Sequence, residues 1–167
     1  MNTPTLNALV VFPQQLEAYY AAVPIAFKQW VPPTWDGVPS EPFSAIEQIC
    51  HVRDIEVDGY HVRFHRVLTE HRPALASIDG EALAKSRSYA TANADEVFKS
   101  FRQARSQTIT LLSNLTPAQL DRTAEFAGYG ALSLRSLVHY LCSHDQQHLA
   151  GLQWLLGKIE ASRAHEK

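Results

Sequence analysis

Apolar residues recur at intervals of three and four along most of the chain, which is the period of an α-helix. Runs in which apolar and polar residues alternate between turn signals do not stand out in the sequence. Long amphipathic stretches cover roughly residues 3–22, 43–72, 92–114 and 133–162. The pattern predicts an all-α fold, an antiparallel four-helix bundle with a long crossover connection, formed by a single domain over residues 1–167.

Capping residues and prolines indicate where the first helix begins and ends. Thr3 or Thr5 can cap its start. Pro13 lies inside the apolar pattern and predicts a kink, and Pro24 predicts the end of the helix near residue 22. The proline-rich segment 31–42 that follows is expected to be a loop.

Similar signals divide the rest of the chain. Ser44 and Glu47 are spaced like a capping box at the start of the second helix. Residues 72–91 are expected to form a long connection with a helical turn near 81–85. Thr116-Pro117 predicts a short helix that ends near Leu120. The segment 122–131 contains two glycines and is interpreted as a loop.

Composition and charge exclude several classes of protein. The 46% hydrophobic and 19% charged residues are typical of a globular core. A net charge of -2 gives no basic excess for nucleic-acid binding, and no apolar stretch is long enough to span a membrane. The N-terminus lacks the pattern of a secretory signal, so Cys50 and Cys142 are expected to be reduced thiols in the cytoplasm.

The sharpest candidate for chemistry is the pair His144 and His148. Residues at i and i+4 on a helix lie about 40° apart, and this spacing lets two imidazoles reach one metal ion. The apolar stripe of the last helix shares their direction (Leu137, Leu141, Leu152, Leu155 and Ile159). The pair therefore interrupts a face that should be buried, where an unsatisfied polar group costs roughly 1–3 kcal/mol. Two core histidines bonded to carbonyls or waters would fit the same pattern.

A catalytic metal site usually has a third protein ligand and keeps one position open. The candidates on the second helix and just beyond it are His51, His61, His65 and His71. Periodicity does not choose among them, because the apolar stripe of that helix centres nearly opposite His51. Elsewhere, His139 is expected to face solvent, and His165 falls in the C-terminal tail.

The chain from Leu6 to about Ile159 resembles the DinB/YfiT-like superfamily of four-helix proteins. Three segments carry the resemblance in order: Phe43-Ser44 followed by His51, Asp54 and Glu56; Leu112 to Leu120; and Leu132 to Leu137, which leads into His144-Asp145-Gln146-Gln147-His148. Phe43 stands where the family usually has Trp. The resemblance implies that His51, His144 and His148 form a three-histidine site for Zn²⁺, Ni²⁺ or a similar ion, and that the protein is a homodimer.

The family's known activities imply thiol chemistry at such a site, either transfer of a low-molecular-weight thiol to a small electrophile or thiol-dependent isomerisation or hydrolysis. Three neutral imidazoles leave the full charge of the ion available for this chemistry. Asp54 and Asp145 are candidates for orienting the imidazoles from outside the ligand shell. The substrate is expected to be a small molecule.

Two other functions compete with this interpretation. The sequence His144 to His148 superficially resembles the His-Glu-x-x-His motif of metallopeptidases, but Asp145 is shorter than the required Glu and no strand is expected to align a peptide. The second alternative is a non-catalytic stress-response protein that binds a metal or a small molecule. Tight metal binding without turnover of electrophiles by any common thiol would favour it.

Overall fold

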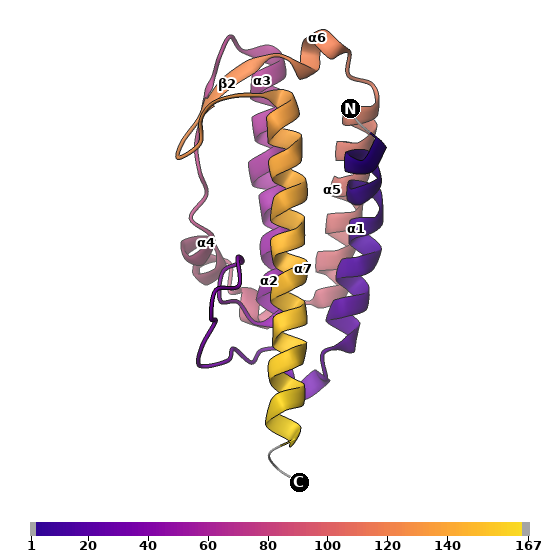
Figure 1. The fold of residues 1–167 in the computed structure, drawn as a ribbon, viewed down its shortest axis with the longest axis vertical. Helices are drawn as coiled ribbons and strands as arrows, with labels where there is room; N and C mark the ends of the chain where they lie inside the picture. The colour runs from indigo at the N-terminus through magenta and orange to yellow at the C-terminus, as the bar shows by residue number, and fades with distance from the viewer. Residues whose placement is uncertain (1–2, 165–167) are drawn as a thin grey trace.

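The computed structural model describes residues 3–164. Within that range, four long helical rods run along a common axis (Figure 1). They are α1 (Thr3–Ala22), the continuous rod of α2 (Ala45–Asp54), η2 (Ile55–His61) and α3 (Val62–Thr69), α5 (Ala94–Ser113), and α7 (Leu134–Ala164). Helix α1 packs against α5 and α7, and α2 does the same. The four-helix bundle predicted from the periodicity is confirmed.

The chain direction reveals the crossover. In Figure 1, α1 and α7 run downward, whereas the α2–α3 rod and α5 run upward. Since two successive rods point the same way, the connection between α3 and α5 must return along the bundle. It contains β1 (Ala74–Leu75), α4 (Gly80–Ser86) and η3 (Tyr89–Thr91). The predicted long connection and its helical turn near residues 81–85 are both present.

Most helix boundaries follow the signals in the sequence. Helix α1 continues through Pro13 and ends at Ala22, and it already includes Thr3 and Thr5, the two residues expected to cap its start. A short 3-10 turn, η1 (Ile25–Phe27), precedes the proline-rich loop. The capping box of Ser44 and Glu47 is formed. The short helix α6 (Pro117–Leu120) has its own box with Thr116 as the N-cap.

The segment interpreted as a loop at 122–131 is instead part of a β-hairpin. Strand β2 (Thr123–Phe126) pairs antiparallel with β3 (Gly130–Ser133), and β1 adds to β2 in parallel. Ala124 and Phe126 are buried while their neighbours are exposed, so the strand does alternate, but only over four residues. Four residues are too few to separate such a pattern from a loop.

Two clusters of buried apolar residues fill the bundle. The first cluster includes Phe12 and Phe101. The second includes Phe64 and Leu137 and extends to the buried residues of the hairpin. No helix in the described range is long and apolar enough to cross a membrane. The site described next lies where α2 and α7 pack against each other.

Candidate metal centre and its cavity

Three histidines from two helices converge on one point. His51 comes from α2, and His144 and His148 come from α7. The Nε2 atom of His144 lies 3.2 Å from Nε2 of His51 and 3.1 Å from Nε2 of His148. One nitrogen from each ring lies within 4.8 Å of the other two. The structure therefore brings together the three residues that the family resemblance implies as ligands.

The spacing of these nitrogens suits a single ion. Zinc–nitrogen bonds of about 2.0–2.1 Å in tetrahedral geometry place ligand nitrogens roughly 3.3 Å apart. The separations of 3.1 and 3.2 Å are close to that value. His51 and His148 are fully buried, while His144 is partly exposed to a cavity. Three protein ligands, two of which (His51 and His144) line a cavity, resemble a catalytic site more than a closed structural one.

Burial in the bundle also favours the neutral, metal-binding form of each ring. The pKa of His51 is lowered by burial, which outweighs the opposing effect of Glu41. Burial lowers the pKa of His144 and His148 well below the usual value, and the neighbouring histidines add to the effect. Because only a neutral imidazole can bind a metal, the site is prepared for an ion at neutral pH.

The position of the pair on α7 follows from its apolar stripe. The stripe residues expected to share its direction are all buried: Leu137, Leu141, Leu152, Leu155 and Ile159. His139 is exposed on the other side of the helix, as expected, and its Nδ1 lies 3.3 Å from the hydroxyl of Thr5. His165 lies outside the described residues.

The choice of His51 among the candidate third histidines could not be read from periodicity. Helix α2 buries eight of its ten residues, so its wheel does not define one inward face. His61 lies next to the carbonyl of Ala104 and the hydroxyl of Thr108 instead. His65 and His71 are exposed.

Gln48, one turn before His51, holds the orientation of His148 and was not singled out in the sequence. Its Oε1 atom lies 2.5 Å from Nδ1 of His148, which fixes the proton on Nδ1 and leaves Nε2 free to bind a metal. The Gln48 amide nitrogen in turn donates to the backbone carbonyl of Glu41. By contrast, Nδ1 of His51 has no hydrogen-bond partner among the described residues.

The two aspartates expected to orient the histidines have other partners. Asp54 accepts hydrogen bonds from Arg53 and Tyr89 and pairs with Arg87. Asp145 accepts two hydrogen bonds from Arg105. No hydrogen bond within residues 3–164 joins either carboxylate to an imidazole, which corrects the expectation: their residue types fit the role, but strong cationic partners elsewhere hold them.

A buried charged network lies behind the histidines. Arg105 of α5 binds Glu56 and Asp145 with two hydrogen bonds each, and Thr108 donates to Glu56. Burial disfavours the charge on Arg105, but the two carboxylates outweigh it and raise the pKa of the guanidinium. Glu56 belongs to η2, a π-helical segment; such segments are frequent at functional sites. The network links α7, at the residue next to His144, to α5 and η2.

Glu41, from the proline-rich loop, adds a carboxylate next to the site. Its oxygens lie 3.6 Å from Nε2 of His51 and 3.6 Å from Nε2 of His148. Gly80 permits this packing, since a Cβ there would lie 2.6 Å from Cε1 of His51 and 3.2 Å from the Glu41 carboxylate. The proline-rich loop and the start of α4, which are distant in sequence, therefore pack together against the histidines.

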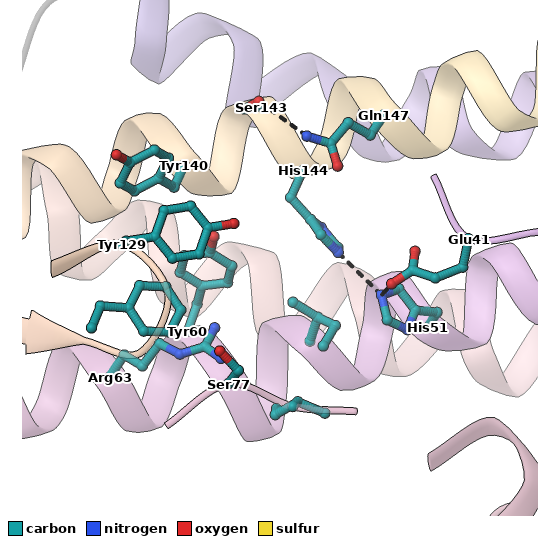
Figure 2. A pocket seen from close by; sticks show the side chains of 13 residues that line it. Glu41, His51, Tyr60, Arg63, Ser77, Tyr129, Tyr140, Ser143, His144 and Gln147 are labelled. Atoms are coloured by element: carbon teal, nitrogen blue, oxygen red, sulfur yellow. Dashed lines mark hydrogen bonds and ion pairs between the residues drawn. The ribbon is translucent and has the colours of Figure 1, made fainter. Parts of the chain in front are cut away.

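The cluster opens into a cavity of about 270 Å³ between the α2–α3 rod, α7 and the hairpin. His51, His144 and Glu41 line one part of it, and Tyr60, Arg63, Tyr129 and Tyr140 line another (Figure 2). Such a volume lies just below the range typical of small-molecule sites, about 300–1,000 Å³. The cavity can admit a small ligand and brings it beside the histidines.

Fold and site together define a helical-bundle protein with three histidines that could hold one metal ion. The profile of the DinB superfamily matches residues 8–152, and the chain belongs to this superfamily. YfiT from Bacillus subtilis, described as a probable metal-dependent hydrolase with an unusual four-helix bundle topology, matches with a TM-score of 0.82. The two sequences are 17% identical, and the match covers 96% of this chain and 90% of that one, which shows the shared fold. A comparison with curated proteins finds no match.

Proposed function

We propose that the protein is a metal-dependent enzyme that transfers a low-molecular-weight thiol to a small electrophile. The observation that supports this most is a cluster of three neutral imidazoles at the wall of a cavity sized for a small molecule. A divalent ion held by these residues would keep its full positive charge and could lower the pKa of a bound thiol or water. Zn²⁺ and Ni²⁺ both accept imidazole ligands.

The protein's own residues have separate tasks in this proposal. His51, His144 and His148 hold the ion, and Gln48 keeps His148 in the tautomer that can bind it. The thiol sulfur forms a bond to the electrophilic carbon, and the leaving group departs with the bonding electron pair. The thiol proton passes to a base; the nearest carboxylate is Glu41, which lies beside two of the ligand nitrogens.

Hydrolysis is the second candidate, with water as the nucleophile in place of the thiol. The same Glu41 carboxylate favours it, because a base beside an ion suits the activation of water. The name given to YfiT, a probable metal-dependent hydrolase, points the same way for a protein of the same fold. A reducing cytoplasm would supply the thiol that distinguishes the two reactions.

Metal analysis followed by a screen of nucleophiles tests the proposal. Protein made without a histidine tag should contain about one divalent ion per chain, and His51→Ala, His144→Ala and His148→Ala should each lose most of it. His139→Ala, on the exposed side of α7, is the matched control and should retain it.

Turnover then separates the candidate functions. Metal-loaded protein should consume small electrophiles faster with thiols than with water alone. Consumption that is independent of any thiol would favour hydrolysis. Stoichiometric metal binding without turnover by either nucleophile would contradict the enzyme proposal and favour a binding protein. Full metal content in all three variants would exclude the histidine site itself.

A further inference from the structure

Arg63 is a buried cation without an anionic partner in the described part of the chain. Its side chain is 7% exposed and lines the cavity. One guanidinium nitrogen donates to the carbonyl of Ala76, and Nε has no hydrogen-bond partner. The other buried arginine, Arg105, binds two carboxylates. A buried charge ordinarily needs such a partner, because its removal from water is costly.

Aromatic rings hold the guanidinium in place without neutralising it. Its central carbon lies 5.2 Å from the ring centre of Tyr60 and 4.6 Å from that of Phe126. Burial lowers the pKa of Arg63, and the ionisable groups that oppose this effect are the hydroxyls of Tyr60 and Tyr129 rather than any carboxylate. Because Nε is itself buried, a ligand in the cavity can reach the guanidinium only through its terminal nitrogens, on the side that lines the cavity.

The cavity is electrostatically polarised. Figure 2 shows Arg63 among the tyrosines at one end, with His51, His144 and Glu41 at the other. In the metal-free protein, the carboxylate of Glu41 would repel an anion from the histidine end, and Arg63 would attract one to the opposite end. Between the two ends, Tyr60 offers an aromatic wall suited to a flat or apolar body, since its ring centre lies 5.2 Å from the guanidinium carbon of Arg63 and 6.5 Å from the ring centre of His144.

We propose that Arg63 binds a carboxylate of the electrophilic substrate, so that the substrate is a small organic acid whose reactive carbon points towards the histidines. This assignment rests on the proposed function, in which the thiol sulfur occupies the histidine end and the electrophile fills the rest of the cavity. An arginine fork matches a carboxylate with two parallel hydrogen bonds, and this geometry explains why the position holds Arg.

Binding of benzoate and benzyl alcohol to metal-free protein at pH 8 tests the anion subsite separately from any metal chemistry. The two probes share a ring and differ in charge, and calorimetry measures both affinities. We expect benzoate to bind at least about tenfold more tightly than benzyl alcohol. Arg63→Gln should abolish this preference and leave the affinity for benzyl alcohol unchanged. Arg66→Gln, an arginine one turn later that pairs with Glu70, is the control and should preserve it.

Equal binding of the two probes to the wild type, or an unchanged preference in Arg63→Gln, would overturn the subsite. If Arg63→Gln does not fold, Arg63→Lys decides the question: it keeps the charge but loses the fork, so the preference must fall.

A second experiment uses metal-loaded protein with 2-mercaptoethanol, a thiol without a carboxylate. Faster turnover of 4-(bromomethyl)benzoate than of its methyl ester would assign the carboxylate to the electrophile, and equal rates would overturn that assignment. Anion preference without any turnover would contradict the proposed enzyme alone.

Discussion

At the scale of single residues, the two cysteines show why the proposed nucleophile must come from outside the chain. Burial raises the pKa of the Cys50 thiol to about 12 and that of Cys142 to about 11. Only the thiolate is nucleophilic, and at pH 8 about one Cys142 in a thousand would be ionised. Neither side chain lines the cavity. An internal thiol therefore does not fit the chemistry proposed for the histidine site.

This predicts slow modification of both cysteines in the folded protein. With 5,5'-dithiobis(2-nitrobenzoate) at pH 8, the native protein should react far more slowly than the same protein in urea, which should release two equivalents. Cys142→Ser would identify the source of any residual native reaction, since Cys142 is the more exposed of the two. Rapid reaction of native Cys50 would contradict the burial described for it.

The buried histidines also predict how acid affects the metal-free protein. In the unfolded chain their pKa is near 6.5, whereas burial lowers it in the folded state. Below about pH 6.5 the unfolded state therefore binds more protons at these histidines, so their contribution to the free energy of unfolding falls as the pH falls. Burial raises the pKa of Asp145 to about 7, and its contribution changes in the opposite direction, so the comparison with a histidine variant isolates the effect. Urea unfolding at pH 7.5 and 5.5 should show this loss. His148→Leu should reduce the loss, and His139→Ala should leave it as in the wild type.

The site residues divide into those that the sequence could and could not predict. His144 and His148 were recognisable because they interrupt an apolar stripe at the spacing of a metal-binding pair. His51 depended on the family resemblance, because α2 is buried on more than one side. Gln48 carries no charge and belongs to no motif. Arg63 contacts Ala76 and Phe126, which lie in other parts of the chain, so its surroundings depend on tertiary packing. Their roles become visible only in the fold.

At the scale of secondary-structure elements, the close packing of α2 and α7 explains a glycine in the middle of a long helix. A Cβ at Gly151 would lie 2.5 Å from the hydroxyl of Ser40 and 2.8 Å from the amide nitrogen of Gln48. A Cβ at Gly157, further along the same helix, would have no neighbouring atom within 4 Å. The two glycines therefore differ in packing but share a helix.

Alanine substitutions at these two positions should have opposite effects. Gly157→Ala should raise stability by up to about 1 kcal/mol through helix propensity alone. Gly151→Ala should displace Gln48, loosen His148 and weaken metal binding by about 10–100-fold. Competition with a chromophoric chelator measures the affinity, and thermal unfolding measures the stability. Equal metal affinity in the two variants would show that Gln48 does not support the site.

The elements that the sequence did not predict are those formed by tertiary pairing. Strand β2 finds its partners in β3 and in the distant β1, which lies in the crossover connection. Gly128 and Gly130 adopt positive φ angles of 84° and 74° in the turn, a conformation that glycine permits. The same glycines made the segment resemble a loop. The π-helical segment η2 was not predicted either, because residues 43–72 were interpreted as one continuous α-helix.

At the scale of the whole molecule, we predict a homodimer that uses the exposed side of α1. Val10 and Val11 are 53% and 45% exposed there. Three other apolar residues of α1 and α5, Phe12, Phe98 and Phe101, are buried within one chain and are not available to an interface. Light scattering should give twice 18.7 kDa, and Val10→Asp with Val11→Asp should halve that mass. A monomeric wild type at micromolar concentration would contradict the prediction.

The stability of the whole bundle should depend on the ion, because the three ligands join α2 to α7. A ligand that binds only the folded state adds RT ln(1 + [L]/Kd), about 2.7 kcal/mol when its concentration is one hundred times Kd. For a chain of this length, each kcal/mol shifts the melting temperature by about 2–4 °C, so chelation should lower it by roughly 5–10 °C. The ligand variants should melt at the same temperature with and without chelator, whereas His139→Ala should respond like the wild type. An identical chelator effect in His148→Ala would place the stabilising ion somewhere other than the three histidines.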